Sequence, residues 1–272
     1  MRPSVTCSSS SARESSGTAT VPTEAYKRRN GSYMSRDRHT ASTEGTAIAA
    51  AIAGKGRPAR DRSRDRRDQT SEILAFAAVA SGEVVADFLP FRGYYTRLFS
   101  ALVGERGRTY AVVPRDLTRI ARIKAGGAEI AEFAKGMPNI RLIDGAAESA
   151  GELPEPVDLF WISENYHDLH DPFMGPVPIA KFNAAVFSAI RPGGRLIVID
   201  HVAGKGSPED VTNSKHRIEP AVARREIEAA GFHSDGHCDA LFNPADKHGL
   251  TIFARGIRYH TDRFVYRFRK PL

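Results

Sequence analysis

The stretch EVVADFLPFRGYYTRLFSALVG, residues 83–104, joins an apolar run to a helical pattern through a short loop. Its first seven residues predict a strand buried on both faces, because large polar residues hardly interrupt them. A helical face then follows at Tyr95, Leu98, Phe99 and Leu102, and Gly104 stands where that helix would end. A buried strand that leads directly into a helix is the repeating unit of a parallel α/β sheet.

The same alternation continues downstream. Further strands are predicted at residues 108–114, 139–144, 157–163 and 195–201, and helices at 116–136, 181–194 and 219–232. The helix at 116–136 is expected to break at its Gly126-Gly127 pair. Two last β-rich pieces, 232–242 and 262–270, have no helix between them and should pair antiparallel. The sequence therefore predicts a doubly wound, mainly parallel seven-stranded sheet with a C-terminal antiparallel hairpin.

The sequence also predicts whether Trp161, Arg217 and the arginines of the last strand are buried or exposed. Trp161 lies inside a predicted strand and should belong to the core. Arg217 is expected to pair with a surface acid. The stretch TDRFVYRFRKP, residues 261–271, alternates apolar and basic side chains. That alternation is typical of a half-buried edge strand, so its arginines are expected to be solvated.

The charge of the chain is unevenly distributed. Residues 1–70 hold 14 Lys and Arg against 7 Asp and Glu, whereas the other 202 residues hold 25 of each. Residues 1–44 are Ser-rich and poor in large apolar side chains, so we expect them to be disordered. Residues 45–272 are expected to form one domain, with a helical lead-in at 45–80.

The run RPARDRSRDRR, residues 57–67, could be a nucleic-acid patch, but its alternating aspartates favour a solvated linker or helix. Nucleic-acid binding is therefore expected to be weak and non-specific at most.

The two cysteines, Cys7 and Cys238, lie far apart and without metal-ligand spacing. Free thiols and a cytoplasmic location are therefore expected. No apolar run approaches the ~20 residues that span a bilayer, and the first 30 residues lack a secretory apolar core.

Polar or conformationally special residues follow four of the predicted strands. In doubly wound sheets, ligands bind beyond the carboxyl ends of the strands, where the strand order reverses. The expected ligand-binding residues at these ends are Asp87, Leu89, Gly93, Pro114, Asp116, Asp144, Gly145, Asn165 and Tyr166. Asp116 stands where many nucleotide-binding folds place an acid for ribose hydroxyls.

Three histidines are candidate general bases, because imidazole titrates near neutral pH. They are His167 and His170, in the fourth of these loops, and His201, which ends the fifth strand. Each could instead only satisfy loop backbone groups. A metal site built from His167, Asp168, His170 and Asp171 is conceivable, but one short loop rarely directs four ligands at one ion. The sequence therefore predicts no metal.

Six stretches resemble a bacterial family of predicted methyltransferases of the class I, S-adenosyl-L-methionine-dependent type. They are RPARDRSRD, DFLPFRGYYTRLFS, ENYHDLHD, RPGGRLIVIDHVAGKGS, HRIEPAVARREIEAAGF and TDRFVYRFRKP. The resemblance covers residues 46–271. It implies a Rossmann-like methyltransferase fold and S-adenosyl-L-methionine as cofactor. No catalytic signature of a nucleic-acid, protein or lipid acceptor appears, so a small-molecule acceptor is expected. The resemblance also implies that residues 57–65 belong to the first helix of the domain.

The sequence departs from the family pattern at the most sensitive loop. Asp87, Pro90, Gly93, Tyr94 and Thr96 match the family, but Phe91 and Arg92 replace its first two glycines. A Cβ there can block positive φ or the close approach of a cofactor. The departure leaves a second possibility, a non-catalytic binding or regulatory protein on an altered methyltransferase scaffold. A nicotinamide-dependent reductase is disfavoured, because the glycine fingerprint is poor and the chain closes with a hairpin.

Overall fold

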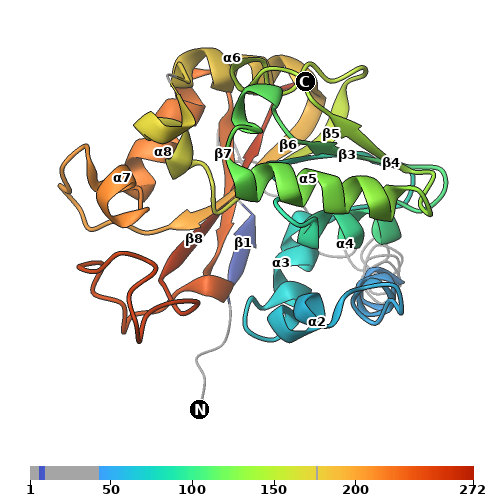
Figure 1. Ribbon diagram of the computed structural model, residues 1–272, viewed down its shortest axis with the longest axis horizontal. Coiled ribbons are helices and arrows are strands. Elements are labelled where there is room, and N and C mark those ends of the chain that lie inside the picture. Colours follow the sequence, from blue (N-terminus) through green and yellow to red (C-terminus); the bar gives the residue numbers. More distant parts are fainter. Residues whose placement is uncertain (1–5, 10–42, 176) are drawn as a thin grey trace, which may run out of the picture.

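The computed structural model describes residues 6–9, 43–175 and 177–272. Within them, eight strands form one sheet in the order β1-β7-β8-β6-β5-β2-β3-β4 (Figure 1). The strands are β1 (Cys7–Ser9), β2 (Val84–Phe88), β3 (Arg108–Val112), β4 (Ile140–Ile143), β5 (Val157–Ser163), β6 (Ile190–His201), β7 (His233–Cys238) and β8 (Arg263–Arg269). Strands β2 to β6 are parallel, and β8 runs antiparallel between β6 and β7.

This arrangement confirms the predicted doubly wound sheet and its C-terminal antiparallel pair. All seven strands predicted from the apolar runs are present. The eighth strand, β1, comes from the segment that we expected to lack structure, so that expectation fails for residues 7–9. The rest of the N-terminal segment, residues 1–5 and 10–42, lies outside the described residues.

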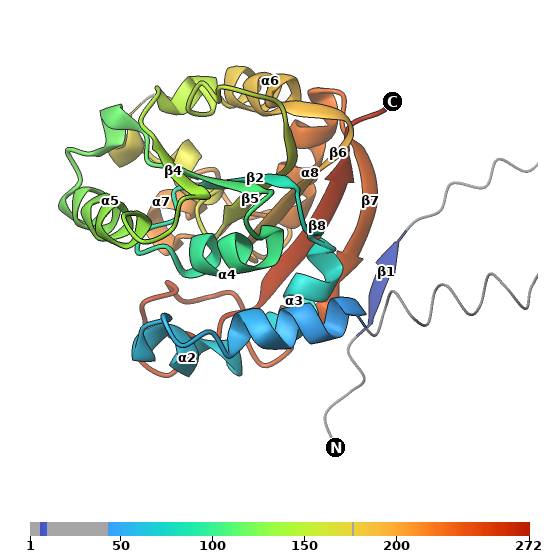
Figure 2. The ribbon, with the colours of Figure 1, turned by 90° about the vertical axis from the view of Figure 1, so that its right-hand side faces the viewer.

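Helices cover both faces of the sheet (Figure 2). On one face lie the helical residues 43–52, α3 (Thr70–Ala77) and α4 (Tyr94–Val103). They share a buried cluster with Val85, Leu159 and Trp161 of the strands. On the other face, α6 (Ile179–Ala189) and α8 (Pro220–Ala229) share a second buried cluster with Phe160 of β5 and Leu196 of β6. Apolar side chains at successive strand positions are thus buried on opposite faces. Trp161 is fully buried beside Tyr95 and Phe99, as predicted.

Helix α5 (Ala121–Ala134) continues through the glycine pair where a break was expected. A Cβ at Gly126 would lie 2.1 Å from the Phe91 carbonyl oxygen, and one at Gly127 would lie 3.1 Å from Val113. The two glycines therefore allow the helix to approach the sheet closely, and they do not interrupt it.

The lead-in helix α2 (Ala59–Asp65) is anchored to the body of the domain by its acidic residues. Asp61 is buried and bonds the Arg97 guanidinium of α4 at 2.7 Å. Asp65 accepts a hydrogen bond from the Tyr94 hydroxyl at 2.7 Å. Just beyond the helix, Asp68 lies 3.3 Å from Arg263. This geometry fits a helix of the domain, as the resemblance implied, better than a free nucleic-acid patch.

Two expectations about charged and sulfur-bearing residues are wrong. The structure joins Cys7 and Cys238 in a disulfide, because β1 pairs with β7 and sets their Cα atoms 4.0 Å apart. The expected cytoplasmic location was argued from free thiols, so the disulfide removes that argument. Strand β8 is interior, and its Arg263 and Arg267 are buried in ion pairs, although Arg269 is largely exposed.

The described residues include no helix of the length and apolarity that a membrane crossing requires. Among helices α2 to α8, the longest is α5, with 14 residues.

Candidate functional site

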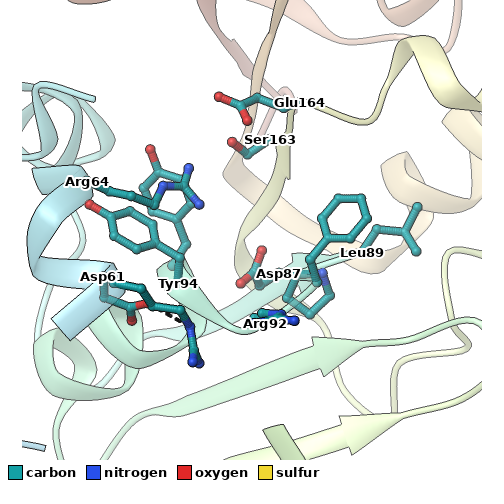
Figure 3. Close-up of a pocket in the computed structure, with 12 residues that line it drawn as sticks. Asp61, Arg64, Asp87, Leu89, Arg92, Tyr94, Ser163 and Glu164 are labelled. Carbon is teal, nitrogen blue, oxygen red and sulfur yellow. Dashed lines mark ion pairs between the residues drawn. The ribbon is translucent and has the colours of Figure 1, made fainter. Parts of the chain in front are cut away.

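A cleft opens at the carboxyl ends of β2 and β5, where the strand order of the sheet reverses (Figure 3). Its cavity volume is about 250 Å³. The end of β2, the start of α4, the end of β5 and helix α2 supply its lining, which includes Arg60, Asp61, Arg64, Asp87, Leu89, Pro90, Phe91, Arg92, Tyr94, Tyr95, Ser163 and Glu164. This is the position at which doubly wound sheets bind their ligands.

Asp87 is the buried acid of this cleft. Only 2% of the residue is exposed, and its Oδ2 accepts a hydrogen bond from the Thr96 hydroxyl at 2.7 Å. Burial raises the pKa of Asp87 to about 7, although the Thr96 hydrogen bonds and the charge of Arg97 oppose the shift. The carboxyl group can therefore change its charge near neutral pH, which is a property of functional carboxyls.

The loop after β2 has the left-handed backbone that favours glycine at three positions, but only one of them, Gly93, is a glycine. Leu89, Phe91 and Gly93 have φ values of 49°, 48° and 75°. Left-handed backbone costs a residue with a side chain on the order of 1–2 kcal/mol. At Gly93 a side chain would be strained by the positive φ, and its Cβ would lie 2.9 Å from the Ile130 side chain, which would have to move. Phe91 thus occupies a position that favours glycine, whereas the Arg92 side chain is 65% exposed.

Asn165 ties the loop after β5 to the loop after β2. Its Nδ2 donates to the carbonyl oxygens of Phe88 and Leu89 at 3.1 and 3.2 Å. Its buried Oδ1 has no hydrogen-bond partner among the described residues. A buried amide oxygen without a partner is unusual and can receive a donor from a ligand.

Of the expected ligand-binding residues, Asp87 and Leu89 line this cleft, whereas Gly93 and Asn165 lie in the loops beside it. The remaining ones lie elsewhere. Tyr166 is fully buried and bonds Glu226 and Asn183, on the side of the sheet that α6 and α8 cover. Asp116 and Asp144 are exposed after β3 and β4, and Asp116 accepts the Ala147 N–H at 3.1 Å. Pro114 and Gly145 are buried, and a Cβ at Gly145 would lie 2.3 Å from the Gly151 carbonyl oxygen.

His201 lies in a second cavity, of about 240 Å³, which shares Arg64 and Glu164 with the cleft. Burial lowers the pKa of His201 to about 4, against the opposing charge of Glu164, so its imidazole is neutral at pH 7. Its Nδ1 lies 2.8 Å from the Thr261 hydroxyl. The other lining residues are Arg67, Asp68, Ile252, Phe253, Arg258, Tyr259, Thr261 and Arg263.

The other two candidate bases lie elsewhere. His167 is buried, with Nδ1 2.7 Å from Asp200 and Nε2 3.2 Å from Asp168. Although burial favours the neutral imidazole, the two carboxylates raise the pKa of His167 well above its ordinary value. His170 lies 3.2 Å from Glu226 and lines a different cavity, between α7 (Val211–Lys215) and α8. Of the three histidines, His201 is the one beside the cleft.

Sequence reasoning missed Arg64 and Glu164, which line both cavities, and Arg263, which lines the second. Arg263 forms ion pairs with Glu164 and Asp68. Glu164 belongs to the loop that the sequence had singled out, so its position after a strand was the available signal. Arg64 and Arg263 gave no such signal, because their partners lie far away along the chain.

The fold is that of class I S-adenosylmethionine-dependent methyltransferases. The chain is 18% identical to a methyltransferase of this kind from Aquifex aeolicus, with a TM-score of 0.52 over 79% of this chain and 99% of that one. An arsenic(III) methyltransferase from Chlamydomonas reinhardtii is 16% identical, with a TM-score of 0.51 over 83% of this chain and 73% of that one. An N-methyltransferase from Bradyrhizobium japonicum is 12% identical, with a TM-score of 0.50 over 77% and 97%. No protein-family model and no curated protein matches the sequence.

Proposed function

We propose that this chain is an S-adenosylmethionine-dependent methyltransferase that acts on a small-molecule acceptor. The observation that carries the proposal is the pair of adjoining cavities at the switch point of the sheet, which share Arg64 and Glu164. Asp87 lies in one cavity and His201 in the other. Two connected sites of this kind suit a reaction that brings a cofactor and an acceptor together.

The residues of the cleft fit the amino-acid end of the cofactor. Asp87 and Glu164 are carboxylates for its ammonium group, and Arg64 is a cation for its carboxylate. The free Oδ1 of Asn165 is a further acceptor beside the same loop. When bound, S-adenosylmethionine supplies an electrophilic methyl group on a sulfonium.

The second cavity fits a small acceptor that carries negative charge. Four arginines line it, at positions 64, 67, 258 and 263, against the carboxylates of Asp68 and Glu164. In the tautomer whose Nδ1–H donates to the Thr261 hydroxyl, Nε2 of the neutral His201 imidazole can accept a proton from an acceptor hydroxyl or amine. Thr261 acts as the positioning residue for that ring.

Cofactor affinity should rise with pH, because Asp87 must lose its proton to attract the ammonium group. With a pKa of about 7, the ionised fraction of Asp87 grows about tenfold between pH 6 and 8, and affinity should follow it. Titration calorimetry with S-adenosylhomocysteine at both pH values measures this. The Asp87→Asn variant should bind more weakly and lose this part of the pH dependence.

Titrations with NADH and with S-adenosylmethionine test the proposed cofactor. Heat from NADH, with none from S-adenosylmethionine or S-adenosylhomocysteine, would overturn the proposed cofactor. Binding that is unchanged in Asp87→Asn would leave the cofactor in place but remove Asp87 from its site.

Replacement of Phe91 by glycine should tighten cofactor binding by about tenfold or more, which corresponds to about 1.4 kcal/mol. The backbone already has the left-handed conformation that glycine prefers, so the variant removes a side chain and strain together. Calorimetry of Phe91→Gly against Arg92→Gly measures the effect. The Arg92 variant is the matched control, since that side chain is 65% exposed. An equal gain in both variants, or weaker binding in Phe91→Gly, would show that Phe91 does not obstruct the site.

A further inference from the structure

Four potential metal ligands converge outside the cleft, in a group that the sequence alone did not assemble. Three come from one short turn, at His167, Asp168 and Asp171, and the fourth is His216, which caps the end of α7. One ligand atom from each residue lies within 4.8 Å of all the others. The objection that one loop rarely supplies four ligands does not apply, because His216 comes from a separate segment and His170 is paired with Glu226 instead.

Three of the distances between these atoms are near those of a tetrahedral zinc site. His167 Nε2 lies 3.2 Å from Asp168 Oδ1, and His216 Nδ1 lies 3.6 Å from that same oxygen. His216 Nδ1 is also 3.9 Å from Asp171 Oδ2. Ligands at about 2.0–2.1 Å from a tetrahedral zinc ion stand about 3.4 Å from one another. The most distant of the four ligand atoms lie within 4.8 Å of each other, so a cation at the centre would draw the group together by up to about 1.4 Å.

The carboxylate of Asp171 is buried without a compensating hydrogen bond. Only 1% of the residue is exposed, and neither of its oxygens has a hydrogen-bond partner among the described residues. Burial raises the pKa of Asp171, and the nearby Thr212 hydroxyl opposes that rise. The same hydroxyl donates a hydrogen bond to the Glu209 carbonyl oxygen at 3.5 Å. A buried carboxylate without a hydrogen bond is costly, and a bound cation would reduce that cost.

Asp200 holds the His167 ring in the orientation that a metal ligand requires. One Asp200 oxygen lies 2.7 Å from His167 Nδ1, and the other accepts the backbone N–H of His167 at 2.7 Å. The ring therefore presents Nε2 to the group. Histidine ligands are commonly fixed in this way, with a carboxylate on the nitrogen opposite the metal.

A path from the surface reaches the group at His216. Its side chain is 20% exposed, and it lines a shallow cavity of about 420 Å³ together with Ile120, Ala121, Arg122 and Phe173. The two aspartates would balance the charge of a divalent ion, and the two imidazoles would bind it as neutral ligands. A mixed nitrogen and oxygen set of four suits zinc better than magnesium or calcium, which prefer all-oxygen shells.

We propose that His167, Asp168, Asp171 and His216 bind one divalent transition-metal ion, with Zn²⁺ as the best fit. The ion would fasten the turn at residues 167–171 to the end of α7, and the site is independent of cofactor binding. The protein should therefore bind Zn²⁺ whether or not the proposed methyl transfer occurs.

Calorimetric titration of the full-length, untagged, chelator-treated protein with Zn²⁺ tests the proposal. We expect one ion per chain and a rise in melting temperature on binding. Co²⁺ should also bind and give the intense visible absorption of a four-coordinate site. His216→Ala should weaken Zn²⁺ binding by at least about tenfold, whereas the matched variant His170→Ala should leave it unchanged.

The Asp171→Asn variant distinguishes the loss of a metal ligand from the loss of the folded structure. Without metal, this variant should be at least as stable as the unaltered protein, because a buried charge without a hydrogen bond is removed. It should nevertheless bind Zn²⁺ at least about tenfold more weakly. Zn²⁺ affinity that is equal in the unaltered, His216→Ala and Asp171→Asn proteins would overturn the proposal, as would no binding at all. Either result would leave the four side chains as a buried, proton-linked cluster.

Discussion

Asp61→Asn is expected to lower the free energy of unfolding by about 3–5 kcal/mol, because it leaves a charged guanidinium buried and unpaired. Asp61 Oδ2 and Arg97 Nε are 2.7 Å apart, and the two side chains are 3% and 2% exposed. The pair joins α2 to α4. Urea denaturation of the variant and the unaltered protein measures the effect.

An exposed carboxylate of the same chemistry provides the control. Glu132 pairs with Lys135, but their side chains are 73% and 72% exposed. Glu132→Gln should therefore cost less than about 1 kcal/mol. The double variant Asp61→Leu with Arg97→Met should lose less stability than Asp61→Asn, since no buried charge remains. A cost for Asp61→Asn as small as that of Glu132→Gln would show that this pair does not hold the helix.

The same substitution should also affect the cleft, since α2 forms one of its walls. Asp61 and Arg64 both line the cavity, and release of α2 would displace them. We therefore expect Asp61→Asn to weaken S-adenosylhomocysteine binding, and Glu132→Gln to leave it unchanged. Charged residues of the run at 57–67 thus both hold α2 in place and line the proposed cofactor site.

The strands could be predicted from the sequence because both faces of a covered sheet require apolar side chains. Strand β8 was misplaced at an edge for a related reason. Its alternation of apolar and basic residues is the usual pattern of a half-exposed strand, but Arg267 bonds Asp235 of β7 and the carbonyl oxygen of Phe76. Partners so distant in sequence leave no periodic signal. The disulfide was missed in the same way, since Cys7 and Cys238 are 231 residues apart.

The cleft beside Asp87 was partly predictable, because strand ends in a parallel sheet meet at one edge. Asp87, Leu89 and Asn165 are close together for that reason. His167 and His170 were harder to place, since the loop that carries them forms a tight helical turn after Tyr166. Within that turn, neighbouring side chains face different parts of the molecule. A sequence can place a residue at the correct edge of the sheet without deciding which cavity its side chain enters.

Arg217→Met should destabilise the protein by about 3–5 kcal/mol, because it removes one partner of a second buried ion pair. The sequence predicted a surface role for this arginine, but its side chain is fully buried and lies 2.9 Å from Asp246. It also donates hydrogen bonds to the carbonyl oxygens of Val202 and Leu250, both at 2.9 Å. Arg217 thus fixes the segment at residues 243–262 against the end of β6. Denaturant unfolding measures the loss.

Arg224→Met is the matched control for this prediction, because it breaks a helical pair in which the arginine is 52% exposed. Its cost should stay below about 1 kcal/mol. The segment that Arg217 holds carries Phe253, Arg258 and Tyr259 of the second cavity. Hydrogen exchange in Arg217→Met should therefore increase first in residues 243–262, and acceptor turnover should fall more than cofactor affinity. If exchange instead increased evenly along the chain, Arg217 would support the whole fold and have no particular role in shaping that cavity.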